Sequence, residues 1–285
     1  MLHNKNLNMP FCLCWANENW SRRWDGRDKD ILIEQHYSYD PDQIELHFRY
    51  LLEYFLDKRY LHDSESNPLF LIYRVENIPN MDTFINMFNK LARDNDIERI
   101  NFISQYPVSR SSRNYKQFDY IGFEPLYTRW QLNNDLLYAF IENPYYVVKS
   151  IIKAAIRRLS HNNLAIYSYS EVSKASINRK GRNAHTMLSS FPGWDNTPRR
   201  NKNGTVYTDS TPELFGEYTY NQFVNAHNEA NDEFFFVNAW NEWGEGAHLE
   251  PDSKWGYRYL EAIEAAKIRF TEKFKFQGGM KSHVK

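Results

Sequence analysis

Residues 234–246 read FFFVNAWNEWGEG and change character part-way along. The first four, residues 234–237, are all apolar, which is typical of a short strand that is covered on both faces. Asn241, Glu242 and Glu245 then follow among two tryptophans and two glycines. Barrels of alternating strands and helices place their active sites at the carboxyl ends of buried parallel strands. The stretch therefore predicts a buried strand that delivers functional side chains to the mouth of such a barrel.

Glu242 and Glu245 are the residues of this stretch that are best suited to catalysis. Carboxylates transfer protons and aromatic rings stack on the apolar faces of sugars, so their mixture indicates sugar chemistry. An offset of three would point the two side chains to opposite faces of a straight strand. They can converge only if the chain turns between them, and Gly244 permits such a turn. The alternative is a pair of solvated loop carboxylates, which the adjoining strand, tryptophans and glycines disfavour.

The composition bounds the class of protein. The chain has 285 residues, which suits one large α/β domain or two small ones. Hydrophobic residues make up 42%, which excludes a disordered chain, and a net charge of −1 gives no indication of a nucleic acid or other polyanionic partner. No apolar run approaches the ~20 residues of a transmembrane helix. Aromatic residues make up 16%, which either a carbohydrate cleft or a large aromatic core would explain.

Two other stretches repeat the change from apolar to polar. The apolar segment 10–16 leads directly into Asn17 and Glu18, with Trp20 close behind. The segment 187–191 leads into a loop that contains Trp194 and Asp195. The carboxyl ends of neighbouring parallel strands meet at one edge of a sheet, so we expect these side chains to line one shared site.

Alternating strands and helices predict βα units and a parallel sheet. We expect one domain over residues 1–272, with an insertion at about 126–186, and a disordered basic tail over 273–285. The expected barrel strands are 10–16, 69–73, 100–104, 120–123, 187–191 and 234–237; the expected helices start at 41, 81, 144, 211 and 258, and residues 165–169 form a short extended piece.

Other common site motifs are missing from the sequence. It contains no phosphate-cradling glycine-rich loop, no CxxC pair, no HExxH and no Gly-x-Ser-x-Gly, so we expect no cofactor and no metal site. Cys12 and Cys14 are two apart on one expected strand, which favours a buried reduced pair. The first nine residues lack the apolar core of a signal peptide. These features predict a cytoplasmic protein, with a place at the inner face of the membrane left open.

Three motifs together carry a family resemblance. The first is WANENW at 15–20, followed by RWDG at 23–26; the second is PGWDNTPR at 192–199; the third is WNEWGEG at 240–246, followed by LEPD at 249–252. In this order they resemble the WbsX-like family of bacterial surface-polysaccharide proteins, which is related to glycoside hydrolase family 99. The resemblance covers nearly the whole chain and implies a (β/α)8 TIM-barrel fold.

The resemblance also implies roles for individual residues. The characterised relatives are retaining endo-acting α-mannosidases and α-mannanases. By match, Glu242 is the base that removes a proton from the sugar 2-OH, which attacks the anomeric carbon and forms a 1,2-anhydro sugar. Glu245 is the general acid and then the general base. Glu18 matches a further active-site carboxylate and Trp194 a cleft-lining aromatic. The full set of expected substrate-binding residues is Trp15, Asn17, Glu18, Trp20, Trp194, Asp195, Arg199, Asn241 and Trp243.

This chain departs from the characterised hydrolases in two ways. Gly244 stands where they usually carry a histidine, which bears on substrate specificity. The family domain also normally begins with two further βα units, and this chain begins at what resembles the third strand. We count six barrel strands where a closed barrel needs eight. We therefore expect an open, incomplete barrel, either from a truncated reading frame or because the missing part is a separate chain.

Three functions follow from this reading. The first is a glycoside hydrolase that acts on an α-mannoside-type bond in O-antigen or capsule metabolism. The second is a glycosyltransferase of lipopolysaccharide biosynthesis, although the sequence offers no Asp-x-Asp metal motif and no nucleotide-binding loop. The third is a non-catalytic glycan-binding protein. Each takes an oligo- or polysaccharide as partner, with a lipid-linked form and the oligomeric state left open.

Overall fold

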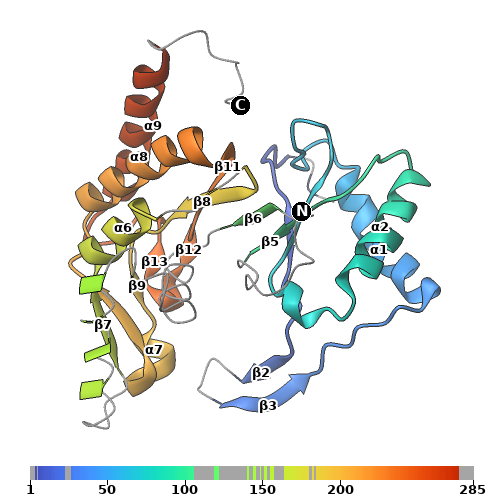
Figure 1. The fold of residues 1–285 in the computed structure, drawn as a ribbon, viewed down its shortest axis with the longest axis horizontal. Coiled ribbons are helices and arrows are strands. Elements are labelled where there is room, and N and C mark those ends of the chain that lie inside the picture. The colour runs from blue at the N-terminus through green and yellow to red at the C-terminus, as the bar shows by residue number, and fades with distance from the viewer. Residues whose placement is uncertain are drawn as a thin grey trace. The chain divides into compact units, whose positions relative to one another are not determined.

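The protein is described here by a computed structural model of the chain (Figure 1). It describes residues 4, 6–22, 27–105, 119–121, 164–179, 182 and 184–275, with isolated positions between 140 and 156. The chain divides into two compact units, which are treated separately below: the first comprises Met1–Ser21 and Lys29–Ile121, the second Arg22–Asp28 and Gly122–Lys285. None of the described helices has the length and apolar character needed to cross a membrane.

The first unit is built on four parallel strands. They are β1 (Leu13–Trp15), β4 (Leu69–Ile72), β5 (Asn101–Ser104) and β6 (Asp119–Ile121), and they pair in that order. Helix α1 (Pro41–Phe55) leads toward β4, and α2 (Met81–Arg93) lies between β4 and β5 in the chain. These elements confirm four of the expected strands, two of the expected helices and the expected βα alternation.

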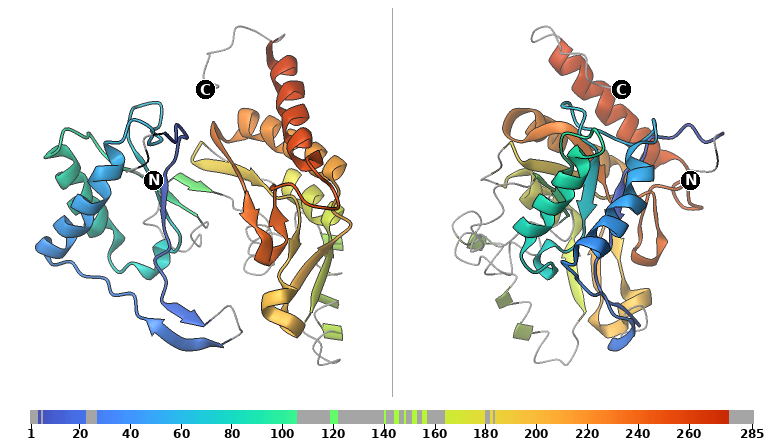
Figure 2. Two further views of the ribbon diagram at one scale, coloured as in Figure 1. Left: turned by 180° about the vertical axis from the view of Figure 1, so that it is seen from behind. Right: turned by 90° about the vertical axis from the view of Figure 1, so that its right-hand side faces the viewer.

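The two helices of the first unit have the starts and faces that the sequence predicts. Asp40 caps α1 by accepting a hydrogen bond from the backbone N–H of Asp42 at 3.2 Å, and Pro41 occupies the first helical position. The apolar stripes of α1 and α2 meet in one core, where Phe48 and Phe88 are almost fully buried. Figure 2 shows the two helices side by side. The aromatic content of this unit therefore serves largely as core.

Asn17, just after β1, joins the ends of two strands. Its side chain is 0% exposed, and its Oδ1 accepts a hydrogen bond from the backbone N–H of Arg74 at 2.7 Å. Its Nδ2 donates to the carbonyl of Arg74 at 2.7 Å and to the hydroxyl of Tyr37 at 3.0 Å. The Tyr37 hydroxyl in turn donates to the carbonyl of Asn17 at 2.6 Å. The amide of Asn17 thus holds together the chain that follows β1, the chain that follows β4 and the approach to α1.

We expect Asn17→Ala to destabilise the protein by on the order of 2 kcal/mol, because it removes the hydrogen bonds that the buried amide makes to the backbone N–H and carbonyl of Arg74. Urea unfolding measures this effect. Asn95→Ala is the matched control: it removes an exposed amide that donates to the carbonyl of Leu91, and it should cost less than about 0.5 kcal/mol. Equal losses in the two variants would show that the Asn17 contacts do not hold the strand ends.

Two sets of paired strands form the framework of the second unit, apart from the short ribbon of the site described below. β8 (Thr186–Ser190) and β11 (Asn231–Val237) are parallel neighbours, as expected from their apolar sequences. A second sheet contains β7 (Ala165–Ser168), β10 (Thr205–Thr208) and β9 (Trp194–Asp195) in that order. β7 and β10 are parallel, while β9 and β10 are antiparallel. The extended piece at 165–169 is confirmed as β7, whereas β9 and β10 were not predicted.

The longer described helices of the second unit are α6 (Tyr169–Ile177), α8 (Pro212–Glu229) and α9 (Arg258–Lys275). α8 and α9 lie against each other, and Gly216 allows their close approach because a Cβ at this position would lie 3.2 Å from the Cβ of Ala262. α9 continues past its expected end, so residues 273–275 of the expected tail are helical. Residues 276–285 lie outside the described part of the chain, as do most of the expected helix at 144–159 and residues 23–26 of the first motif.

The fold class is confirmed in its coarser form. All six expected strands exist, as β1, β4, β5, β6, β8 and β11, and the chain is an α/β protein. The described residues contain no closed barrel. The TIM-barrel interpretation and the single domain with its insertion therefore remain predictions. A two-stranded ribbon of β2 (Trp20–Arg22) and β3 (Arg27–Ile33) was not predicted.

Candidate active site

The chain after β11 folds back on itself and brings the two predicted catalytic residues together. Strand β12 (Asn241–Glu242) pairs antiparallel with β13 (Ala247–His248), and the 3-10 turn η4 (Trp243–Glu245) connects them. Gly246 completes the reversal with a φ of +61°, a conformation that glycine adopts without strain. The chain does turn between Glu242 and Glu245, as expected, but the left-handed residue is Gly246 rather than Gly244.

Both glutamates contact one arginine. Arg199, in the short helix α7 (Thr197–Arg200), places its Nη2 2.9 Å from Oε1 of Glu242 and its Nη1 3.6 Å from Oε1 of Glu245. The three side chains are between 27% and 42% exposed, so solvent reaches the cluster but does not surround it. Two carboxylates that share one guanidinium form a single electrostatic unit.

Glu245 has the environment of a proton donor. Burial raises the pKa of its carboxyl, and the charge of Glu242 raises it further, while Arg199 and Arg200 act in the opposite direction. The net shift of the pKa is upward. A carboxyl with a raised pKa holds its proton to higher pH and can serve as a general acid.

The loop before α7 fixes the position of Arg199. Oδ1 of Asp195 accepts hydrogen bonds from the backbone N–H of Thr197 at 2.9 Å and from its hydroxyl at 2.6 Å. Oδ1 of Asn196 accepts from the backbone N–H of Thr205 at 2.7 Å, which ties the same loop to β10. At least one oxygen of Asp195, which was predicted to contact substrate, therefore serves to hold the helix that carries Arg199.

Gly244 leaves the space that Arg199 occupies. A Cβ atom at position 244 would lie 2.6 Å from both Cζ and Nε of Arg199, far inside van der Waals contact. Any residue other than glycine would therefore displace the guanidinium from the two glutamates. Glycine at position 244 therefore leaves room for Arg199 to contact both glutamates.

Trp243 offers an aromatic surface beside the glutamates. The imidazole of His248 stacks on one face of its ring, with centroids 3.6 Å apart and planes inclined by 19°. Its indole N–H donates to Oε2 of Glu250 at 2.6 Å, and Nε2 of His248 lies 3.2 Å from Oδ2 of Asp252. Trp243 remains 50% exposed, so part of its ring is free to stack on a sugar. The sequence analysis did not predict the His248–Asp252 pair.

The other predicted residues of the second unit lie in different settings. Trp194 is 4% exposed and packs in the core beside Phe191 and Tyr207, and its indole N–H is buried without a partner among the described residues. Asn241 is exposed on β12. Trp194 therefore contributes to packing in this structure, and its predicted contact with substrate stays a prediction.

Glu18, Trp15 and Trp20 belong to the first unit. Glu18 accepts a hydrogen bond from Nε of Arg74 at 3.0 Å. Trp15 packs against the core, with its ring 5.8 Å from that of Phe84, and Trp20 is 59% exposed. A common cleft for these residues and the glutamates of the second unit stays a prediction. Among the described residues, no group of three or more His, Cys, Asp or Glu could hold a metal ion.

Comparison with known protein families shows to which family the chain belongs. The sequence profile described as Glycosyltransferase WbsX matches residues 1–263. The chain belongs to the WbsX family. Two relatives named "Uncharacterized protein WxcX", from Xanthomonas campestris pv. campestris strains B100 and ATCC 33913, are each 31% identical over 268 residues. Those matches cover 93% of this chain, which spans only 35% of the length of either relative.

Two solved structures have a weaker likeness to this WbsX-family chain. A "Glycoside hydrolase-like protein" has a TM-score of 0.47 at 12% identity, covering 79% of this chain and 60% of its own. A GH99 endo-alpha-mannosidase from Bacteroides thetaiotaomicron has a TM-score of 0.42 at 14% identity, covering 83% of this chain and 63% of its own. Neither value is high enough to base a conclusion on.

We expect Gly244→Ala to destabilise the protein only modestly, by about 1 kcal/mol or less, because the added methyl group forces the flexible guanidinium of Arg199 away from two partly exposed glutamates. In an Arg199→Ala background most of that cost should disappear, since the space is then empty. Urea unfolding of the wild type, both single variants and the double variant measures this coupling. Additive losses would mean that Gly244 and Arg199 do not share this space.

Proposed function

We propose that this chain carries the reaction centre of a carbohydrate-active enzyme of the WbsX family, which acts on glycosidic bonds through Glu242 and Glu245. The observation that carries the proposal is the pair of carboxylates that contact one guanidinium from the two ends of a single turn. Trp243, half exposed beside them, supports a sugar as the substrate. Paired carboxylates next to an aromatic surface are the usual machinery of glycoside cleavage.

The two glutamates differ in the way that acid–base catalysis needs. Glu245 has its pKa raised, chiefly by burial, and therefore suits the role of the acid that protonates the leaving oxygen. Oε1 of Glu242 accepts a hydrogen bond from Nη2 of Arg199. A carboxylate that accepts in this way is the ionised form, which can act as a base and take up a proton. Arg199 supplies positive charge close to both carboxylates and so limits the repulsion between them as their protonation changes.

We propose the following retaining reaction on an α-mannoside-type bond. Glu242 accepts the proton of the sugar 2-OH, and the 2-oxygen forms a bond to the anomeric carbon. The bond from that carbon to the leaving oxygen breaks, and Glu245 donates its proton to the leaving oxygen. Glu245 then takes a proton from an incoming water, whose oxygen opens the 1,2-anhydro ring at the anomeric carbon, and Glu242 returns its proton to the 2-oxygen.

A transfer reaction is the second candidate, because the family is described as a glycosyltransferase. At the same glutamates, a sugar hydroxyl would replace water in the second step, and the other proton movements would be unchanged. The product would then be a longer saccharide of a surface polysaccharide such as O-antigen or capsule, free or lipid-linked. Product analysis with and without an added sugar acceptor separates the two reactions.

We expect Glu242→Gln and Glu245→Gln each to lower kcat by about 100-fold or more, because glutamine keeps the shape of the side chain but cannot exchange the proton. The assay uses an α-mannoside substrate, with and without sugar acceptors. Glu264→Gln, at an exposed position of α9, is the control and should leave kcat unchanged. Near wild-type turnover in either site variant would remove that residue from the reaction. A wild-type chain that neither hydrolyses nor transfers the sugar would contradict the proposal.

A further inference from the structure

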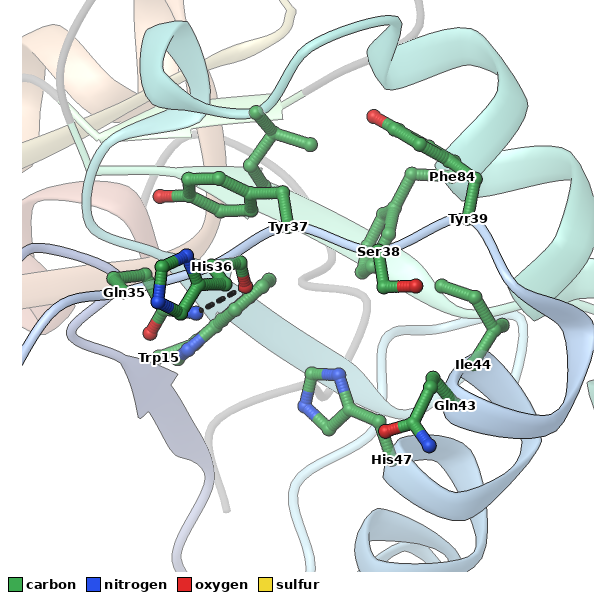
Figure 3. Close-up of a pocket in the computed structure, with 11 residues that line it drawn as sticks. Trp15, Gln35, His36, Tyr37, Ser38, Tyr39, Gln43, Ile44, His47 and Phe84 are labelled. Carbon is green, nitrogen blue, oxygen red and sulfur yellow. Dashed lines mark hydrogen bonds between the residues drawn. The ribbon is translucent and has the colours of Figure 1, made fainter.

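The first unit contains a pocket of about 160 Å³ whose lining residues all belong to that unit (Figure 3). The segment 35–39 forms one side of it, α1 contributes three residues, and Trp15 lies at the end of β1. An apolar protein cavity of ~150 Å³ accommodates benzene. The pocket is thus large enough for one six-membered ring but too small for an oligosaccharide.

Trp15 forms a rigid aromatic wall of this pocket. Its ring centroid lies 5.8 Å from that of Phe84, 6.0 Å from that of Tyr37 and 4.9 Å from that of His47. The Tyr37 hydroxyl accepts a hydrogen bond from Nδ2 of Asn17 and donates one to its carbonyl, which holds this second ring in place as well. Aromatic walls held in place by packing bind a ring-shaped ligand at little cost in conformational entropy.

Unused polar groups converge on the pocket from α1. His47 and Gln43 are four residues apart on this helix, and Figure 3 shows their side chains next to each other. Within the described part of the chain, neither side chain makes a hydrogen bond; Gln43 is exposed and His47 is half-buried. The hydroxyl of Tyr39, in the segment 35–39, is buried without a partner among the described residues. Burial lowers the pKa of His47, so its ring is neutral at physiological pH and offers one donor and one acceptor. These groups can bind a ligand that carries hydroxyl groups.

The residues that line the pocket also indicate whether its ligand is charged. None of the eleven lining residues is Asp, Glu, Lys or Arg. A charged ligand would lose its hydration here without gaining a partner of opposite charge, which is costly. The pocket therefore favours an uncharged polar ring over a sugar phosphate, a uronic acid or a nucleotide.

We propose that this pocket binds one neutral pyranose ring through residues of the first unit, none of which belongs to the glutamate pair. The ring stacks on Trp15, and its hydroxyl groups hydrogen-bond to His47 and Gln43. The choice of a sugar among neutral polar rings rests on the proposed function, whereas the size, aromatic wall and neutrality of the pocket do not. A pocket of this kind would hold a residue of the polysaccharide without taking part in the chemical step.

The test follows the indole N–H signal of Trp15 by ¹H–¹⁵N NMR while the full chain is titrated with methyl α-mannopyranoside, methyl α-glucopyranoside and benzene. Trp15→Phe assigns the signal. We expect a saturable shift with at least one glycoside, with a Kd on the order of 1–10 mM, as suits a single small ring. His47→Phe and Gln43→Leu should each weaken binding at least about fivefold, because each removes one hydrogen-bonding group but keeps the approximate shape. Glu53→Gln, on the exposed side of α1, should not change the affinity.

Other outcomes would overturn the proposal. A Trp15 signal that no glycoside shifts would show that the pocket is not a sugar site, and a shift by benzene alone would make it an apolar cavity. Glycoside affinity that is equal in the wild type and in Gln43→Leu would place the binding elsewhere, even if His47→Phe failed to fold. Glu242→Gln separates this proposal from the proposed function, because it should abolish turnover and leave the Trp15 titration intact.

Discussion

The contact of one guanidinium with two carboxylates is the interaction on which the proposed reaction centre of the second unit depends. Arg199 reaches Glu242 at 2.9 Å and Glu245 at 3.6 Å, and several features of the chain exist to permit this arrangement. Gly244 leaves room for the guanidinium, Gly246 closes the turn that carries both glutamates, and Asp195 holds the start of α7. Partly exposed ion pairs contribute little to stability. The arrangement therefore matters more for the electrostatic environment of the two glutamates than for the stability of the fold.

The sequence predicted the framework well because the framework depends on local patterns. Short apolar runs gave all six main strands, and the helical stripe with its Asp40 and Pro41 start gave α1. The proximity of Arg199 to Gly244 could not be predicted from the sequence. The two residues are 45 positions apart, one in helix α7 and the other in the turn η4, and no local pattern links them. The antiparallel β9 and β10 were missed for a similar reason, since Trp194 and Asp195 resemble loop residues until their partner strand is known.

Residues at strand ends proved easier to locate than to assign. Asn17 lies just after β1, as predicted, but its side-chain amide is buried and hydrogen-bonds to Arg74 and Tyr37. It therefore connects parts of the fold and is not exposed to a ligand in solvent. Trp15 packs against the core and also forms the wall of a pocket. A motif shows where a functional side chain lies in the sequence. The direction of that side chain depends on tertiary contacts, which the spacing of residues in the sequence does not show.

The central claim is that Glu242, Arg199 and Glu245 form one electrostatic unit in which burial and the charge of Glu242 raise the pKa of Glu245. Side-chain ¹³C NMR of glutamate carboxyl groups, followed through a pH titration of the full chain, tests it most directly. The account predicts that Glu245 titrates above the ordinary range of a glutamate, and that Glu242→Gln lowers the pKa of Glu245 by removing the neighbouring charge. A Glu245 that titrates at or below the ordinary range, or that does not respond to Glu242→Gln, would contradict it.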